Sequence, residues 1–334
     1  MKKRYFKRAI CLLMCLLLVV VAFAACNTGE KKAKGGLIKI GIINMVANES
    51  GYRAANVKDF TDVFTVTNGY LAMYTNKPTN EEQIAAFNTY VDEEVSYILL
   101  AAANTKGWEE PLAKAKTAGV KVFLFDRMVE AAENDPSLIE AALVSDMAAE
   151  GATAVDWLLT QGSDLKVLHI KGSLGSAAQL GRSGALEAAA AAGKLTIVAS
   201  GTGGDSWSED EAQKVTAAAI AEGKDFNVVY AENDGMARGA CTALSQAGIS
   251  YGVGGKVIIM GFDCNKWALQ NVLDGKWNYD GQCSPFQASV IDGWIKQLEK
   301  GESLELTEKI QFNPEKGFEA GKITAADVDT YGLG

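Results

Sequence analysis

The chain has 334 residues, carries a formal net charge of −9 at pH 7 and is 48% hydrophobic. Such an acidic balance argues against a nucleic-acid partner and against binding to anionic lipid through a basic patch. A chain of this length exceeds one ordinary hydrophobic core, so we expect two domains.

Residues 1–25 have the pattern of a secretory signal peptide. Five basic residues among the first eight are followed by an apolar run over residues 9–25. The sequence Phe23-Ala24-Ala25-Cys26 resembles a bacterial lipobox, in which the cysteine is lipidated, with Phe23 in place of the usual leucine. Cleavage without attachment of a lipid is the alternative.

Residues 26–36 are rich in Lys, Gly and Glu, which predicts a flexible tether. Acyl chains on Cys26 would hold the protein on the membrane, because each buried methylene contributes roughly 0.8 kcal/mol. Without the five positive charges of the signal, the remaining chain is at −14. We therefore predict an extracytoplasmic protein that is anchored by lipid at Cys26 to the cell membrane.

Three cysteines, Cys241, Cys264 and Cys283, lie beyond the signal and Cys26. They form no C-x-x-C pair, so the spacing indicates neither a zinc site nor a disulfide framework, and no metal site is predicted. Cys264 and Cys283 could pair, which would leave one cysteine over. Free and buried thiols are the favoured alternative.

From residue 37 onward, short β-rich runs alternate with longer helical patterns, which predicts parallel sheets built from right-handed βαβ units. The strand candidates are residues 37–45, 70–74, 96–101, 120–125, 143–145, 166–170, 196–199, 227–230, 257–262 and 278–282. The helix candidates are residues 80–92, 109–118, 147–160, 180–192, 208–221, 235–247, 267–273 and 286–300. Ten strands are many for one sheet, so we assign the first five to one lobe and the next five to another. No Pro/Gly/Ser-rich linker stands at Ser145-Asp146, which indicates a hinge of crossing strands.

The segment after the first strand places Glu49, Tyr52 and Arg53 around Gly51. A carboxylate and a guanidinium suit a ligand with many hydroxyl groups, and an aromatic ring suits its flat C–H face. Loops at the carboxyl ends of strands are where ligands bind in open α/β sheets. The alternative is a solvated loop that leads into a helix.

Polar side chains also follow most of the other predicted strands. They are Asn104 with Trp108, Asp126 with Arg127, Arg182, Trp207, Asn233 with its neighbours Glu232 and Asp234, and Asp263. Asp263 and Asn233, taken alone, are explained better as helix N-caps. A cap does not explain Arg53, Arg127 and Arg182, because arginine near a helix start is unfavourable with the helix dipole. The arginines therefore indicate a polar ligand or salt bridges to Glu49, Asp126 and Asp263.

Several of these motifs together resemble the galactofuranose-type sugar-binding proteins of bacterial ABC transporters. Glu49-Ser50-Gly51-Tyr52-Arg53 is similar to the opening motif of that family, which usually has Trp where this chain has Tyr52. The other similar segments are Phe125-Asp126-Arg127, residues 145–151, residues 172–182, residues 230–239 and Cys283-Ser284-Pro285, the last with Ser in place of the family Asn. The likeness covers residues 37 to about 302.

The resemblance implies an α/β fold of the periplasmic-binding-protein type I, with two Rossmann-like lobes joined by a three-strand hinge. The N-terminal lobe would comprise 37–145 plus 286–306, and the C-terminal lobe 146–285 plus 307–334. It implies a monomer that captures a monosaccharide between the lobes, without a cofactor, and delivers it to the transmembrane subunits of an ABC permease. By motif match, the residues that would hydrogen-bond the sugar hydroxyls are Glu49, Arg53, Asp126, Arg127, Arg182, Asn233 and Asp263. Tyr52 and Trp207 would stack on the faces of the sugar ring, and Cys283 would line the site. The two departures, Tyr52 and Ser284, bear on which sugar binds.

Other functions remain as alternatives. An enzyme is disfavoured because the single histidine, His169, lies in a buried-looking strand, and Gly172–Gly181 matches no phosphate-binding loop. Glu49 and Asp126 could form a glycosidase pair, but neighbouring arginines would lower their pKa values. A sugar sensor coupled to a receptor is a second alternative. A repressor is excluded by the secretion signal and the lack of a helix-turn-helix pattern.

Overall fold

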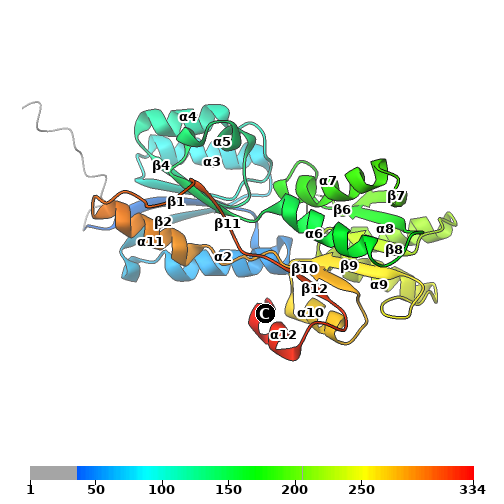
Figure 1. Ribbon diagram of the computed structural model, residues 1–334. Coiled ribbons are helices and arrows are strands. Elements are labelled where there is room, and N and C mark those ends of the chain that lie inside the picture. The colour runs from blue at the N-terminus through cyan, green and yellow to red at the C-terminus, as the bar shows by residue number, and fades with distance from the viewer. Residues whose placement is uncertain (1–35, 205) are drawn as a thin grey trace, which may run out of the picture.

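The computed structural model describes residues 36–204 and 206–334 (Figure 1). The predicted signal peptide, Cys26 and almost all of the predicted tether lie outside the described residues. The described chain forms two α/β lobes, each built on a six-stranded sheet. The predicted α/β architecture of two lobes with mainly parallel sheets is confirmed.

The first sheet has the strand order β11-β5-β4-β3-β1-β2, and all of its strand pairs are parallel. Its strands are β1 (Ile38–Asn44), β2 (Tyr70–Asn76), β3 (Tyr97–Leu100), β4 (Lys121–Asp126), β5 (Ala141–Val144) and β11 (Ile310–Phe312). The first lobe also contains α2 (Gly51–Val63), α3 (Asn80–Asp92), α4 (Glu109–Ala118), α5 (Glu130–Asn134), α11 (Ala288–Glu299) and three short 3₁₀ helices, η1 (Ala47–Glu49), η2 (Val66–Asn68) and η3 (Pro136–Leu138). Figure 1 shows helices on both faces of the sheet, which is why its central strands are buried apolar runs.

The second sheet has the order β12-β10-β9-β8-β6-β7 and is parallel except for the β10–β12 pair. Its strands are β6 (Lys166–Lys171), β7 (Thr196–Thr202), β8 (Val228–Ala231), β9 (Ile258–Phe262), β10 (Tyr279–Gly281) and β12 (Gly317–Glu319). Its helices are α6 (Met147–Leu159), α7 (Ala177–Ala191), α8 (Glu209–Ala221), α9 (Asp234–Gln246), α10 (Lys266–Leu273) and α12 (Ala325–Tyr331). The division into five and five strands is therefore as predicted, with one extra strand on each sheet.

The strand β11 corrects the predicted lobe boundary. The sequence analysis placed all of 307–334 in the second lobe, but β11 pairs with β5 in the first sheet, with Ile310 opposite Ala142. The chain therefore crosses back only between Phe312 and β12. A three-residue strand carries too little hydrophobic periodicity to be predicted, and a sheet edge beside β5 decides its place.

The helix α2 was not among the predicted helices, although a helix after this loop was the stated alternative. Its buried face carries Arg53 and Asn56 beside Tyr52 and Phe60, so it shows no clear apolar stripe. The side chain of Ser50 caps its first turn by accepting a hydrogen bond from the backbone N–H of Arg53 at 3.1 Å. The cap fixes the start of α2 directly after this loop.

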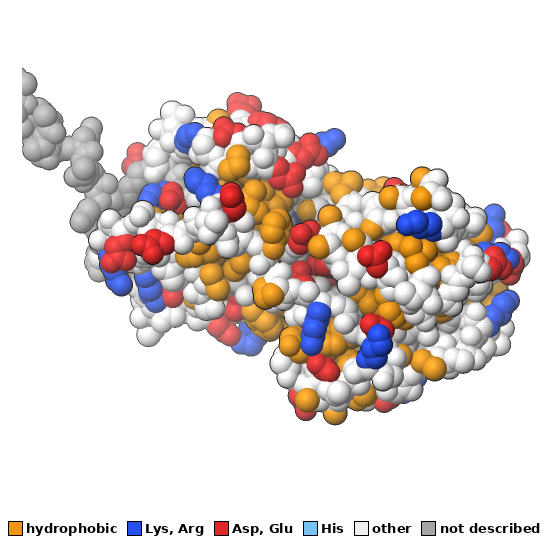
Figure 2. All heavy atoms as spheres, viewed as in Figure 1, with side chains coloured by type: hydrophobic (Ala, Val, Ile, Leu, Met, Phe, Trp, Pro, Cys, Tyr) orange, Lys and Arg blue, Asp and Glu red, His pale blue; other side chains and the backbone are white. Residues whose placement is uncertain are grey.

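The surface carries charges of both signs. Figure 2 shows acidic and basic side chains interspersed over both lobes on the face in view, with apolar side chains between them. Across residues 36–204 and 206–334, no helix combines the length and the apolar character that a membrane span requires.

Candidate ligand-binding site between the lobes

A cavity with an empty volume of about 290 Å³ lies between the two lobes. It is lined by Glu49, Ser50, Tyr52, Asp126, Arg127, Met147, Ala178, Arg182, Trp207, Asn233, Asp263 and Cys283. Nine of the ten residues that the sequence analysis assigned to the site are in this lining, and they come from both lobes. Ser50, Met147 and Ala178 were not predicted, because small and apolar side chains carry no chemical signature of a site.

Arg53, the tenth residue, lies behind the cavity wall. Its side chain is fully buried and its guanidinium is already occupied by protein groups. It contacts the Oδ2 of Asp126, the Oε2 of Glu49 at 3.2 Å, and the side-chain oxygens of Asn44 and Asn56 at 2.8 and 3.0 Å. Arg53 therefore orients the two carboxylates that face the cavity.

The second lobe repeats this arrangement. In each lobe the first α-helix after the first strand carries an arginine, and an aspartate stands at the end of the fourth strand (Asp126) or directly after it (Asp263). Arg182 of α7 contacts Asp263 at 3.2 Å, just as Arg53 of α2 contacts Asp126. Both aspartates have positive φ angles, +63° for Asp126 and +106° for Asp263. Non-glycine residues hold this backbone conformation only where the surroundings impose it, often at functional sites.

The position of Arg182 depends on close packing of α6 against α7. A Cβ atom on Gly181 would lie 2.5 Å from the carbonyl carbon of Met147, and one on Gly151 would lie 2.7 Å from the oxygen of Gly181. Only glycine permits so close an approach of two backbones. The approach brings Glu150 of α6 to 2.8 Å from Arg182, so the arginine is held between two carboxylates.

Tyr52 contributes a hydrogen-bonding hydroxyl as well as an aromatic ring. Its hydroxyl donates a hydrogen bond to the Oδ1 of Asp126 at 2.8 Å and lies 3.3 Å from the carbonyl oxygen of Ser284. Burial raises the pKa of Tyr52 well above its ordinary value, and the nearby Asp126 raises it further. The phenol therefore stays a neutral donor, and it orients Asp126 together with Arg53.

Arg127 and Trp207 present buried donors that the described protein atoms do not satisfy. The Nε and Nη1 atoms of Arg127 and the Nε1 atom of Trp207 have no hydrogen-bond partner among them. The guanidinium of Arg127 lies 5.9 Å from the ring centroid of Trp207, so first-lobe and second-lobe groups meet here. Buried donors are nearly always paired in proteins, so these groups point to a missing acceptor in the cavity.

Asn233 is both a helix cap and a cavity residue. Its Oδ1 accepts a hydrogen bond from the backbone N–H of Met236 at 2.8 Å at the start of α9, which confirms the cap interpretation. Asp263 caps no described helix. Because the cap uses only the oxygen of Asn233, its amide nitrogen remains a donor for the cavity.

The two strand-end aspartates differ in their protonation. Burial raises the pKa of Asp126, but Arg53 and Arg127 outweigh that effect and the net pKa is lowered. For Asp263, burial and the nearby Glu150 outweigh Arg182, and the pKa is raised to about 7. The expectation that neighbouring arginines lower the carboxylate pKa is therefore confirmed for Asp126.

Comparisons with known proteins agree with this geometry. A family model described as a periplasmic binding protein domain matches residues 40–290. The chain belongs to the periplasmic binding protein family. The predicted resemblance to type I sugar-binding proteins of ABC transporters is confirmed.

Two curated relatives and one solved structure illustrate the likeness. The fructose import binding protein FruE of Bifidobacterium longum is 28% identical over 317 residues, which is 92% of this chain and 93% of FruE. The galactofuranose-binding protein YtfQ of Escherichia coli is 30% identical over 281 residues, 81% of this chain and 87% of YtfQ. A Mycobacterium smegmatis protein solved in complex with β-D-fucofuranose has a TM-score of 0.76 at 25% identity and covers 87% of this chain and 93% of its own.

The hinge of this periplasmic binding protein is organised around Glu315. Its Oε1 accepts hydrogen bonds from the Oγ of Ser145 at 2.7 Å and from the backbone N–H of Ser284 at 2.6 Å. Ser145, Ser284 and Glu315 belong to the three different segments that cross between the lobes. One carboxyl group therefore ties all three crossings together.

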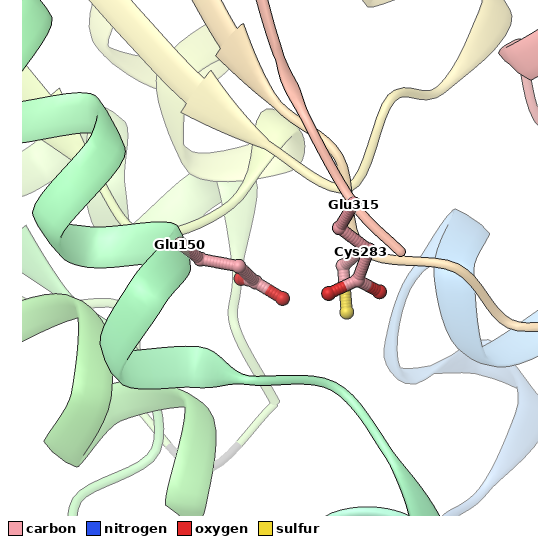
Figure 3. Close-up of side chains that lie close together, drawn as sticks. All are labelled: Glu150, Cys283 and Glu315. Atoms are coloured by element: carbon pink, nitrogen blue, oxygen red, sulfur yellow. The ribbon is translucent and has the colours of Figure 1, made fainter. Parts of the chain in front are cut away.

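Figure 3 shows that the carboxyl groups of Glu150 and Glu315 and the thiol of Cys283 point toward one another. Their ligand atoms lie within 4.8 Å of each other, a spacing that could hold a metal ion. Glu150 is already bound to Arg182, and burial raises the pKa of Cys283 well above its ordinary value, so its thiol stays protonated. The Oε1 of Glu150 and the Oε2 of Glu315 have no described hydrogen-bond partner. This cluster fits one proton held between two carboxyl groups better than it fits a metal.

This proton predicts a pH dependence of stability. Burial and the adjacent Glu150 raise the pKa of Glu315 to about 9, so the folded state binds more protons than the unfolded state between the ordinary carboxyl pKa and about 9. The contribution of Glu315 to the free energy of unfolding is therefore complete below the ordinary carboxyl pKa and is lost as pH rises through about 9. Glu315→Gln keeps the acceptor oxygen and resembles the protonated acid. We expect its unfolding free energy in urea to fall less between pH 6 and pH 9 than that of the native chain.

The exposed Glu302 provides a matched control for this experiment. Glu302→Gln should keep the pH dependence of the native chain. Equal pH slopes for Glu315→Gln and Glu302→Gln would contradict the shared proton.

His169 has a structural environment. It is fully buried in β6, and its Nε2 lies 2.8 Å from the Oε1 of Glu232 and 3.5 Å from the Oγ of Ser183. The serine beside His169 could not be predicted from local sequence, because Ser183 is brought in by α7. The same imidazole nitrogen faces both groups, whereas a catalytic triad uses one nitrogen for each partner. None of the three residues lines the interlobe cavity.

Cys241, Cys264 and Cys283 are buried free thiols. This confirms the favoured prediction over a disulfide between Cys264 and Cys283.

Proposed function

We propose that this protein captures a monosaccharide in the interlobe cavity and delivers it to an ABC permease without altering it. The sugar hydroxyls would bind Glu49, Asp126, Arg127, Arg182, Asn233 and Asp263, while Tyr52 and Trp207 would cover its ring faces. Closure of the lobes would remove water, and the ligand would favour the closed state because only that state offers both sets of contacts. Fructose and galactofuranose, named for the two relatives, are the first candidates.

One observation carries this proposal. Buried donors of Arg127 and Trp207 lack partners among the described protein atoms, and they share the interlobe cavity with carboxylates from both lobes. A monosaccharide supplies hydroxyl acceptors for the donors, hydroxyl donors for the carboxylates and an apolar face for the rings. A sugar that lacks one of these hydroxyls would leave a buried group unpaired and bind much more weakly.

A thermal-shift panel tests the proposal. The purified chain would be mixed with D-fructose, D-galactose, L-arabinose, D-ribose, D-xylose, D-allose and myo-inositol, and each sugar recovered for product analysis. We expect at least one sugar to stabilise the protein by about 2.7 kcal/mol at a concentration of 100 Kd, and to be recovered unchanged. Stabilisation by none of them would count against the proposal, and conversion of a sugar would favour an enzyme.

We further propose that the protein is extracytoplasmic and lipid-anchored through Cys26. This proposal rests on the signal-like residues 1–25 and the lipobox-like sequence that ends at Cys26. Cell fractionation tests it: the native chain should pellet with membranes and Cys26→Ser should not. Equal membrane association of the two would argue against the anchor.

A further inference from the structure

The two lobes touch at a point beside the cavity where one residue has no side chain. Gly51, the first residue of α2, belongs to the first lobe, and Asn265, just before α10, belongs to the second. A Cβ atom on Gly51 would lie 1.8 Å from the Oδ1 of Asn265 and 2.9 Å from its Cγ. Neither residue is in the lining of the ligand cavity.

A second contact of the same kind joins the lobes elsewhere. The backbone N–H of Thr105 in the first lobe donates a hydrogen bond at 3.1 Å to the carbonyl oxygen of Gly175 in the second. A Cβ atom on Gly175 would lie 2.4 Å from the Nδ2 of Asn104. The closed arrangement therefore depends on backbone of one lobe lying directly against groups of the other.

We propose that Gly51 and Asn265 are positioning residues for ligand capture: the missing side chain at position 51 lets the lobes close far enough to complete the site. This inference rests on the proposed function, because it concerns closure around the sugar. It assigns an influence on affinity to two residues that lie outside the lining of the ligand cavity and line an adjoining pocket.

Asn265 cannot easily move out of the way of a side chain at position 51. Its backbone N–H and its Nδ2 both donate to the Oδ2 of Asp234, at 2.8 and 3.0 Å. Asp234 is fully buried, and its carboxyl group lies beside that of Asp280. Rotation of Asn265 would therefore remove a hydrogen bond from a buried carboxyl group, which is costly. The 1.8 Å separation falls 1.6 Å short of an ordinary contact of 3.4 Å, so the lobes themselves would have to stay apart.

The backbone at position 51 does not require glycine. Gly51 is helical and is not among the glycines with positive φ. Alanine is a better helix former than glycine, so α2 by itself should tolerate or even favour alanine there. The effect of Gly51→Ala on closure can thus be separated from an effect on folding.

The test compares Gly51→Ala with Gly293→Ala and with the double variant Gly51→Ala/Asn265→Ala in the full chain. Gly293 lies in α11 of the same lobe, and a Cβ atom there would meet nothing within 4 Å. The Asn265→Ala change removes the three atoms that lie nearest to the new Cβ. The probes are D-fructose, D-galactose, L-arabinose and D-ribose, titrated by calorimetry, with thermal unfolding of each sugar-free variant as the check on folding.

We expect Gly51→Ala to unfold at or above the temperature of the native chain, yet to bind the sugar that the native chain binds roughly tenfold or more weakly, since a smaller fraction can reach the competent state. Gly293→Ala should bind like the native chain, and the double variant should recover most of the affinity. Equal affinity of Gly51→Ala and Gly293→Ala would overturn the inference, as would failure of Asn265→Ala to restore binding.

A sugar-free measurement keeps this inference distinct from the proposed function. If neither these four sugars nor the rest of the thermal-shift panel binds the native chain, the proposed monosaccharide function loses its support. Closure can then be followed by hydrogen exchange at the Thr105 amide, whose partner lies in the other lobe. This amide should exchange faster in Gly51→Ala than in Gly293→Ala, and equal rates would overturn the inference.

Discussion

Arg127→Ala is expected to weaken sugar binding by roughly 100-fold or more while the protein stays folded, because charged hydrogen bonds are worth about 1.5–3 kcal/mol each. Arg127 is 4% exposed, and its Nε and Nη1 atoms have no described hydrogen-bond partner. Its contacts to Asp126 at 3.5 Å and to Glu49 at 3.7 Å are long. The side chain is therefore held for a ligand more than for the fold.

Calorimetric titration with the sugar that most stabilises the native chain would measure this loss, and urea unfolding would measure stability. Arg127→Lys is the informative control, because lysine keeps the charge but not the planar fork, and it should bind with intermediate affinity. Native-like affinity of Arg127→Ala would show that the ligand does not use this side of the cavity.

Arg53→Ala should have the opposite profile and destabilise the protein by about 3–5 kcal/mol, since removal of one partner leaves buried charges uncompensated. Arg53 is 0% exposed, and its loss would leave the carboxylates of Asp126 and Glu49 without their main cation. The amide groups of Asn44 and Asn56 would lose a shared donor as well. Urea unfolding of the sugar-free chain would measure the change.

Arg238→Ala is the matched control for Arg53→Ala. Arg238 also binds a carboxylate through two nitrogens, that of Glu209, but its side chain is 49% exposed. An exposed pair of this kind contributes only about 0–1 kcal/mol. If Arg53→Ala lowers the free energy of unfolding no more than Arg238→Ala does, the buried network does not stabilise the fold. Arg53 would then have to be reconsidered as a ligand-binding residue.

The fold and most of the cavity lining could be predicted because both depend on local patterns. Alternation of strand and helix runs determines parallel sheets, and parallel sheets collect the residues after each strand at one edge. Asp126, Arg127, Arg182 and Asp263 could thus be grouped although they span more than a hundred positions. The division into two lobes followed from the number of strands.

Other features depend on contacts between distant segments and leave no local pattern. Arg53 and Arg127 both follow a strand. The guanidinium of Arg53 is paired with Asp126 and Glu49, whereas Arg127 faces the cavity with donors that have no described hydrogen-bond partner. The short strand β11 joins the first sheet because β5 presents a free edge. The hinge role of Glu315 arises where three crossing segments meet.

The sequence by itself determined the α/β architecture, the sheet edge that carries the site and the residue types found there. It did not determine how the lobes close or which carboxyl groups are protonated. Periodicity and strand order act over a few residues, so they can be read along the chain. Only the tertiary structure decided which arginine faces the cavity, which carboxyl groups lie side by side and which side chain lies against Gly51. Those properties depend on burial and on distances between atoms of different segments, which are set when the two lobes pack together.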